Sequence, residues 1–250
     1  MLNISFMQRE WQLFLSIIKW IKTMIWRRKN LKIKGKSPIL IKFQSKNIID
    51  SLQAGNIYMN GLNIFRKMEE GGDSHEVGDL MENKIFSKAY ELSDGTPCNF
   101  IMTEENKSNY VYCLFYVTFN SNYFQFSDEQ KEKLLCFGDT ALVIQDVQEF
   151  LYRVTNQAEK EGYNIRHRKV MYYKENKEIT KELMNYLAEG LYNFSFLKRD
   201  KYRYQQEYRL AINTEKLEEE HIILKIKDIS DISFQISAKK ILEDGMYVTI

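Results

Sequence analysis

The sequence predicts an α+β fold, in which a single domain with a mixed, mostly antiparallel sheet follows an amino-terminal amphipathic helix. Helix-like and strand-like segments are interspersed, and the strand-like segments nearest the carboxyl end follow one another through short connections. This pattern favours antiparallel or mixed pairing over a doubly wound parallel sheet. No linker-like gap or internal repeat divides the chain. We therefore expect an α+β domain over residues 38–250, preceded by a helix and a basic linker over residues 1–37.

The composition is that of an ordinary globular protein and excludes several classes. With 44% hydrophobic and 28% charged residues, the chain is too apolar to be disordered throughout. Its 36 basic and 34 acidic residues leave a net charge of +2, so charge alone does not predict a nucleic-acid partner. The cysteines form no Cys-x-x-Cys pair, which excludes a zinc knuckle or a thioredoxin-type motif. Cys113 and Cys136 are expected as small buried residues in a reducing cytoplasm.

The expected strands are rich in β-branched and aromatic residues, and the expected helices carry apolar residues at helical spacing. Residues 110–119 are nearly all apolar or aromatic, so we expect a strand buried on both faces that pairs with 99–102. Ser127 is the expected N-cap of the helix that follows it. Strands are expected at 39–43, 57–59, 99–102, 110–119, 141–144, 169–173, 208–212, 222–226, 232–236 and 246–250. Helices are expected at 46–54, 62–68, 128–136, 147–158 and 179–191.

The amino-terminal helix has an unusually broad apolar face. Its central segment, Trp11–Trp26, reads WQLFLSIIKWIKTMIW, and Lys19 and Lys22 interrupt an apolar stretch shorter than the roughly 20 residues of a spanning helix. No small-residue cleavage site follows, so we predict neither a signal peptide nor a transmembrane segment. Three interpretations stay open for the helix at residues 10–28: packing on its own domain, self-association or binding of a protein partner, and contact with a membrane surface.

Common catalytic motifs are absent from the sequence. Neither a P-loop nor a Rossmann glycine pattern occurs, and G-x-S-x-G and H-E-x-x-H are missing as well. His75, His167 and His221 lack metal-ligand spacing, so no histidine metal site is predicted. The sequence therefore specifies no cofactor.

Two clusters of charged residues are candidate sites. In the segment Gly78–Asn83 (GDLMEN), Asp79 and Glu82 would share one helical face and could converge on a cation or a proton. The alternative is an acidic helix start favoured by the helix dipole. Asp139, in the turn Phe137–Asp139, is expected mainly to shape that turn.

The second cluster is the segment FLKRDKYRYQQEYRLAI at residues 196–212. Glu207 and Arg209 alternate along the expected strand and therefore share one face. A guanidinium beside a carboxylate suits an anionic or ribosyl substrate, because arginine binds phosphate through two parallel hydrogen bonds and the carboxylate can orient a hydroxyl. A cross-strand salt bridge is the structural alternative. The expected substrate-binding residues are Arg209, Lys198, Arg199 and Tyr202.

These motifs carry two resemblances. The order GDLMEN, FGD and FLKRDKYRYQQEYRL over about residues 40–213 resembles an uncharacterised bacterial family with an early N-D-P-x-E-like and a late K-x-x-x-Y-x-E-x-E-W-R-like motif. That resemblance implies a bacterial defence or mobile-element context. Gln205-Gln206-Glu207 is similar to the Q-x-E motif of ADP-ribosyltransferases. This similarity implies that Glu207 orients the nicotinamide ribose of NAD and that Gln205 contacts the acceptor.

The leading hypothesis is a cytoplasmic bacterial enzyme acting on a nucleotide-like substrate, by ADP-ribosyl transfer or NAD cleavage in a defence or toxin context. The expected catalytic residues are Glu207, Gln205, Asp79 and Glu82. One alternative is a metal-dependent nuclease that holds Mg²⁺ on Asp79, Glu82 and Glu207. Another is a non-enzymatic subunit of a defence complex that uses the amino-terminal helix as its interaction surface.

Overall fold

A computed structural model describes most of the chain. It covers residues 32–34, 38–70, 88–91, 94–100, 108–119, 121–174, 193–214 and 220–249. The amino-terminal helix, the helix expected at 179–191, and the two acidic residues Asp79 and Glu82 lie outside these described residues.

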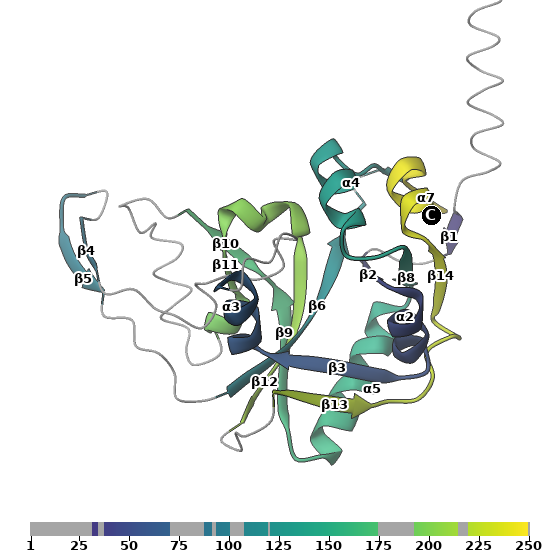
Figure 1. Cartoon of the computed structure of the whole chain (residues 1–250), viewed down its shortest axis with the longest axis horizontal. Coiled ribbons are helices and arrows are strands. Elements are labelled where there is room, and N and C mark those ends of the chain that lie inside the picture. Colours follow the sequence, from purple (N-terminus) through teal and green to yellow (C-terminus); the bar gives the residue numbers. More distant parts are fainter. Residues whose placement is uncertain are drawn as a thin grey trace, which may run out of the picture.

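An eight-stranded antiparallel sheet forms the body of the protein (Figure 1). This sheet and the helices around it confirm an α+β fold with mostly antiparallel pairing. The continuous path runs through β13 (His221–Lys225), β3 (Asn56–Gly61), β6 (Ser108–Val117), β2 (Ile39–Gln44), β8 (Thr140–Ile144) and β14 (Ser233–Ser237). Two further strands, β12 (Glu207–Thr214) and β9 (Asn164–Lys169), extend from β6.

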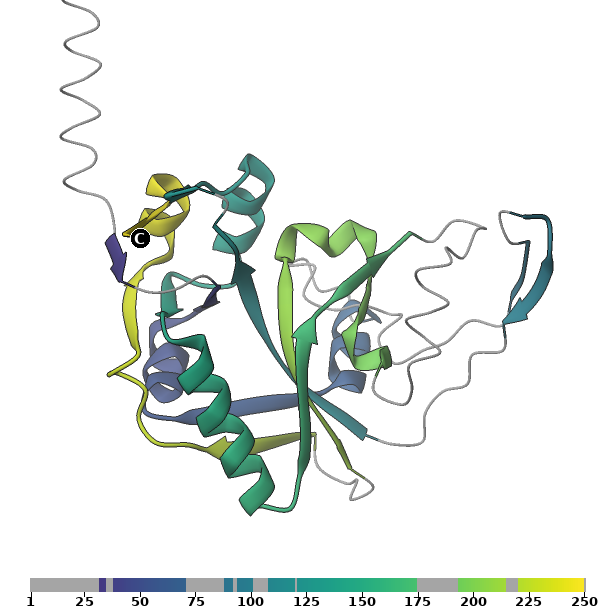
Figure 2. The same ribbon diagram turned by 180° about the vertical axis from the view of Figure 1, so that it is seen from behind.

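Helices and three small sheets surround this body (Figures 1 and 2). The α-helices are α2 (Lys46–Gln53), α3 (Leu62–Glu70), α4 (Asp128–Leu135), α5 (Val147–Lys160) and α7 (Ala238–Asp244), and the 3₁₀ helices are η1 (Asn193–Phe196) and η2 (Asp200–Gln205). The small sheets pair β4 (Lys88–Glu91) with β5 (Pro97–Phe100), β10 (Met171–Tyr173) with β11 (Leu197–Arg199), and β15 (Met246–Thr249) with β1 (Lys32–Lys34) and β7 (Tyr123–Phe124). None of the helices in the described ranges has the length and apolar character needed to cross a membrane.

The central strand β6 has a gap along one of its edges. Strand β12 pairs with β6 along residues 108–115 on one side. On the other side, β3 pairs at Tyr110 and Val111, and β2 pairs only from Phe115 to Val117. After Ile41, β2 diverges from β6, and the chain continues through α2 and returns to the same edge of β6 as β3. Within the described part of the chain, residues 112–114 therefore have no strand partner on this edge.

The two faces of the sheet are covered differently. Apolar residues of α2 and α5 pack on one face, and Figure 2 shows α5 lying across it. The opposite face holds two separate apolar clusters. Phe115 belongs to the cluster with α4 and α7, whereas Val111 and Ala211 belong to a cluster with η1 and β11. In the register of β6 and β12, Glu207 and Arg209 lie between these two clusters. The charged residues thus occupy a break in the apolar covering of this face.

Local sequence signals predicted several elements correctly. Residues 110–119 correspond to the buried strand β6, and Ser127 caps α4: its side chain accepts from Gln130 N at 3.2 Å, while the Gln130 side chain accepts from Ser127 N at 3.0 Å. This reciprocal arrangement satisfies two backbone donors at the start of the helix.

Three sequence-based expectations are wrong. The strand expected at 99–102 does not pair with β6: β5 pairs with β4 instead, and the strand partners of β6 in the described chain are β12, β2 and β3. The last strands do not all follow one another through short connections, because the unpredicted helix α7 separates β14 from β15. Cys136 is exposed rather than buried, because it follows the last turn of α4, where its thiol donates to Glu132 O.

Candidate functional site

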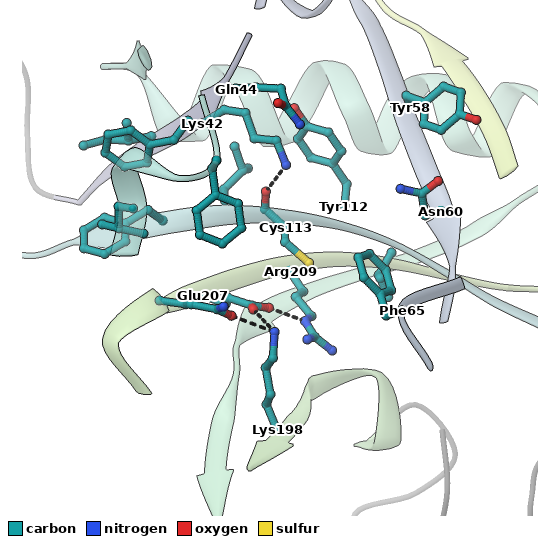
Figure 3. Close-up of a pocket in the computed structure, with 18 of the residues that line it drawn as sticks. Lys42, Gln44, Tyr58, Asn60, Phe65, Tyr112, Cys113, Lys198, Glu207 and Arg209 are labelled. Carbon is teal, nitrogen blue, oxygen red and sulfur yellow. Dashed lines mark hydrogen bonds and ion pairs between the residues drawn. The ribbon is translucent and has the colours of Figure 1, made fainter. Parts of the chain in front are cut away.

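A cavity of about 200 Å³ opens at the gap beside β6 (Figure 3). Residues from β2, β3, α3, β6, α4, β11, η2 and β12 line it. Its polar and charged lining residues are Lys42, Gln44, Asn60, Cys113, Lys198, Gln205, Glu207 and Arg209. Tyr58 and Met68 both line the cavity and are exposed, so they form part of its rim. The sheet gap therefore becomes a pocket with a charged interior and an apolar rim.

A buried carboxylate lies between two cations in this pocket. Lys198 Nζ is 2.5 Å from Glu207 Oε1, and Arg209 Nε is 2.6 Å from Glu207 Oε2. The three side chains are only 4%, 7% and 1% exposed, respectively, so the cations rather than solvent neutralise the carboxylate. Arg209 Nη1 also donates to Ser195 O at 2.9 Å, which fixes the guanidinium from its other end. We call Lys198, Glu207 and Arg209 the ion-pair cluster.

Local backbone geometry brings the Q-x-E residues onto the same lysine. Gln205 ends η2 and Glu207 begins β12, while Gln206 between them is left-handed, with φ 39°. Gln205 Oε1 accepts from Lys198 Nζ at 2.6 Å. A left-handed residue other than glycine costs on the order of 1–3 kcal/mol. The surrounding contacts maintain this conformation, which turns both side chains towards Lys198.

The environment of Glu207 keeps it ionised. Burial by itself would raise the pKa of this carboxyl, but the charges of Arg209 and Lys198 and their hydrogen bonds outweigh it and lower the pKa far below its usual range. Cys113, which lines the same pocket, behaves in the opposite way: burial, together with the negative charge of Glu207, raises the pKa of its thiol to about 12. Cys113 is therefore a neutral thiol near neutral pH and not an activated nucleophile.

Lys42 is a pocket residue that the sequence analysis missed as a site residue. Its Nζ donates to Cys113 O at 2.9 Å, across the edge where β6 has no strand partner, and lies 4.6 Å from the centre of the Tyr112 ring. Figure 3 shows Lys42 on one side of Cys113 and the ion-pair cluster on the other. The signal in the sequence was the single lysine in the apolar strand ILIKFQ, where a charged side chain is unusual.

The structure brings four of the predicted site residues together: Lys198, Gln205, Glu207 and Arg209. Arg199 and Tyr202 are buried but are not among the residues that line the pocket, and Lys198 Nζ lies 4.7 Å from the centre of the Tyr202 ring. Tyr202 therefore supports the lysine from outside the pocket.

The contacts of Asp139 stabilise the turn in which it lies. Its side chain accepts from Thr140 Oγ1 at 2.9 Å, and its carbonyl accepts from Ala238 N at 2.8 Å. Asp139 thereby links the turn before β8 to the start of α7, as a turn-shaping role requires.

Metal binding has little support in this pocket. Among the described residues, no three His, Cys, Asp or Glu side chains are grouped as a metal ion would require. Glu207, the described member of the acidic set proposed for Mg²⁺, has a cation on each carboxylate oxygen. Asp79 and Glu82, the other two members, lie outside the described residues.

Comparison of the chain with protein-family models, with curated proteins and with solved structures finds no match. The resemblances to the bacterial family and to ADP-ribosyltransferases thus remain expectations that rest on motifs. The geometry of the pocket carries the functional argument.

Proposed function

We propose that the protein binds a nucleotide-like ligand in this pocket, with an anionic group at the ion-pair cluster and a ring system at the rim. The observation that carries the proposal is the charge balance of the ion-pair cluster. Among the described residues of this cluster, Lys198 and Arg209 supply two positive charges and Glu207 supplies one negative charge, so positive charges outnumber negative charges by one. In a buried site this excess favours a phosphate or carboxylate over a neutral ligand.

The rim suits the ring of such a ligand. Tyr58 is 44% exposed and its ring stacks on His221 with centroids 4.3 Å apart, while Phe65 lines the pocket beside it. Aromatic side chains of this kind bind flat heterocycles by stacking and apolar contact. A ligand with a flat ring at one end and an anionic group at the other would match both parts of the pocket.

The size of the pocket limits how much of a ligand it encloses. Its volume of about 200 Å³ is below the roughly 300–1,000 Å³ of pockets that enclose drug-sized ligands. We therefore propose that it holds a mononucleotide-sized group, or one end of a dinucleotide such as NAD with the other end outside.

The sharpest form of the proposal is ADP-ribosyl transfer or NAD cleavage by a cytoplasmic bacterial enzyme. Glu207 would stabilise the positive charge that develops on the ribose as the glycosidic bond breaks, and Gln205 would position the acceptor. The location of both side chains on the pocket, and the ionised state of Glu207, support these roles. Within the described residues, the two cations use two of the approximately four acceptor sites of a carboxylate, so others are free for a ribose hydroxyl.

Two assays test this proposal: the first measures ligand binding and the second measures enzymatic activity. In the first, ADP-ribose and NAD are added to the full-length protein and the melting temperature is measured, with adenosine as the uncharged control. A rise in melting temperature with the charged ligands is expected. If neither charged ligand raises the melting temperature or binds in equilibrium dialysis, the binding proposal is wrong.

The second assay measures nicotinamide release from NAD and transfer of labelled ADP-ribose to proteins of a bacterial lysate. We expect activity in the wild type, loss of activity in Glu207→Gln, and wild-type activity in Glu243→Gln. Glu243 is the matched control because its pair with Lys239 is exposed and neither residue lines the pocket. Binding of NAD without either reaction would reject the enzymatic form and leave the binding proposal intact.

A further inference from the structure

Lys42 has no counter-ion among the residues that the structure describes. Lys42 lines the pocket, and among the described residues its Nζ has one hydrogen bond, to the neutral carbonyl of Cys113. No carboxylate of the described chain forms an ion pair with it, whereas Lys198 in the same pocket contacts Glu207 directly. A lysine in a site of low polarity without a paired carboxylate either receives its counter-ion from a ligand or acts as a neutral amine.

Burial shifts Lys42 towards the neutral amine. Burial lowers the pKa of Lys42, although the negative charge of Glu207 acts in the opposite direction. The ion pairs that Glu207 forms within the described chain are with Lys198 and Arg209, and none is with Lys42. A neutral amine can donate one hydrogen to Cys113 O and still direct its lone pair elsewhere.

The gap beside β6 makes this amine accessible. Residues 112–114 have no strand partner on that edge within the described chain, and the Lys42 side chain reaches Cys113 O there and lines the pocket. Figure 3 shows its Nζ directed towards Cys113, beyond which lies the ion-pair cluster. Because Lys42 and the ion-pair cluster line the same pocket, a ligand whose anionic group is held by the cluster would have to extend past Cys113 to reach this amine.

We infer that Lys42 is a reactive amine that forms an imine with a carbonyl-bearing anionic ligand held in this pocket. The Nζ lone pair adds to the carbonyl carbon and the carbon–oxygen double bond becomes a single bond, which gives a carbinolamine after proton transfer from nitrogen to oxygen. The carbon–oxygen bond then breaks, and the oxygen leaves as water with both hydrogens of the amine, while a carbon–nitrogen double bond forms. No oxidant or reductant is consumed. This inference rests on the proposed anion site.

The probe for this reaction is pyridoxal 5′-phosphate, an aromatic aldehyde that carries a phosphate. The full-length protein is incubated with a limiting amount of the probe, the imine is reduced with borohydride, and the modified lysines are identified by peptide mass spectrometry. Lys46 is the internal control, since its side chain is 59% exposed and paired with Asp50. Because a lowered pKa increases the neutral fraction of an amine, and because Lys42 lines the pocket whereas Lys46 does not, we expect Lys42 to carry most of the adduct and Lys46 little of it.

Two variants and one analogue make the test specific. Lys42→Arg should lose the adduct and should retain its fold in circular dichroism, whereas Lys46→Arg should keep the adduct at Lys42. The distribution of modified lysines in the wild-type protein does not depend on either variant. It shows whether Lys42 is modified selectively even if Lys42→Arg does not fold. Pyridoxine 5′-phosphate has an alcohol in place of the aldehyde, cannot form an imine, and reports on the anion site alone.

The outcomes separate this inference from the proposed function. Binding of the alcohol analogue together with a selective Lys42 adduct supports both the anion site and the imine. Binding of the analogue with adducts spread over exposed lysines overturns the imine and leaves the anion site. A selective adduct without binding of the analogue supports the reactive amine and counts against the anion site. If the analogue does not bind and no selective Lys42 adduct forms, both the anion site and the imine are wrong.

Discussion

Arg209 Nε lies 2.6 Å from Glu207 Oε2, and the two residues are two positions apart on one face of β12. Both side chains are almost completely buried, so neither charge is stabilised by bulk water. Lys198 completes the arrangement from β11, on the other oxygen of the carboxylate. A buried charge cluster costs desolvation free energy and adds little net stability compared with apolar packing. The three side chains line a pocket, and we propose that they are kept there to bind a ligand rather than to stabilise the fold.

The first prediction concerns the stability of the ion-pair cluster. Glu207→Gln keeps the shape of the side chain but removes its charge, which leaves Lys198 and Arg209 buried without a counter-ion. Loss of one partner of a buried pair costs about 3–5 kcal/mol, and we expect a decrease of this size in the free energy of unfolding. The measurement is denaturant unfolding followed by circular dichroism.

The control for this prediction is Glu243→Gln. The pair between Glu243 and Lys239 is 60% and 71% exposed, and exposed pairs contribute about 0–1 kcal/mol. If Glu207→Gln were no more destabilising than Glu243→Gln, the cluster would not be desolvated as its burial indicates.

The second prediction concerns how the contribution of Glu207 to the free energy of unfolding depends on pH. The folded-state pKa of Glu207 lies below that of the unfolded chain, so its contribution to stability is complete above the ordinary glutamate value of about 4.3 and is lost as the pH falls below it. The difference in unfolding free energy between the wild type and Glu207→Gln should therefore narrow as the solution is acidified from about pH 6 to pH 3. A difference that stays constant over this range would contradict the lowered pKa.

The third prediction tests the close contact that holds the end of β2, the strand that carries Lys42. A Cβ added at Gly138 would lie 2.2 Å from the backbone carbon of Gln44, so Gly138→Ala must displace this strand. Overpacking of this kind costs about 1–3 kcal/mol or more, and the displacement should also weaken binding of the pocket ligand.

Gly162→Ala is the matched control for the glycine prediction. Gly162 also has a positive φ, 77°, but an added Cβ would meet no atom within 4 Å. Its cost should be limited to the backbone conformation, about 1–2 kcal/mol, with ligand affinity unchanged. Equal loss of ligand affinity in the two variants would show that the contact with Gln44 does not position the pocket.

The sequence predicted the elements whose signals are local. Glu207 and Arg209 were assigned to one face because strand alternation has a period of two, and Ser127 was assigned as a cap because its hydrogen bond spans three residues. Pairing of β6 with β12, β2 and β3 joins segments that are far apart in sequence, and no local pattern specifies which strand fills which edge. The gap in the sheet could not be predicted for the same reason.

The role of Lys42 depends on that gap. As an isolated lysine in an apolar strand it has several explanations, and only the three-dimensional arrangement brings its Nζ to Cys113 O and to the pocket of Glu207. Lys198 and Gln205 were predicted as site residues from charge and motif, but their shared hydrogen bond depends on the left-handed conformation of Gln206. Composition does not reveal this conformation, because glutamine rarely adopts it.

The most direct test of the central claim, that the pocket binds the anionic group of a nucleotide-like ligand, is calorimetric titration of the full-length protein with AMP and with adenosine. A charge-assisted hydrogen bond contributes about 1.5–3 kcal/mol, so AMP should bind about ten- to a hundredfold more tightly than adenosine. The affinity for AMP should fall in Tyr58→Ala, which removes an exposed rim residue without disturbing the core. Equal affinities for AMP and adenosine, or no binding of either, would contradict the claim.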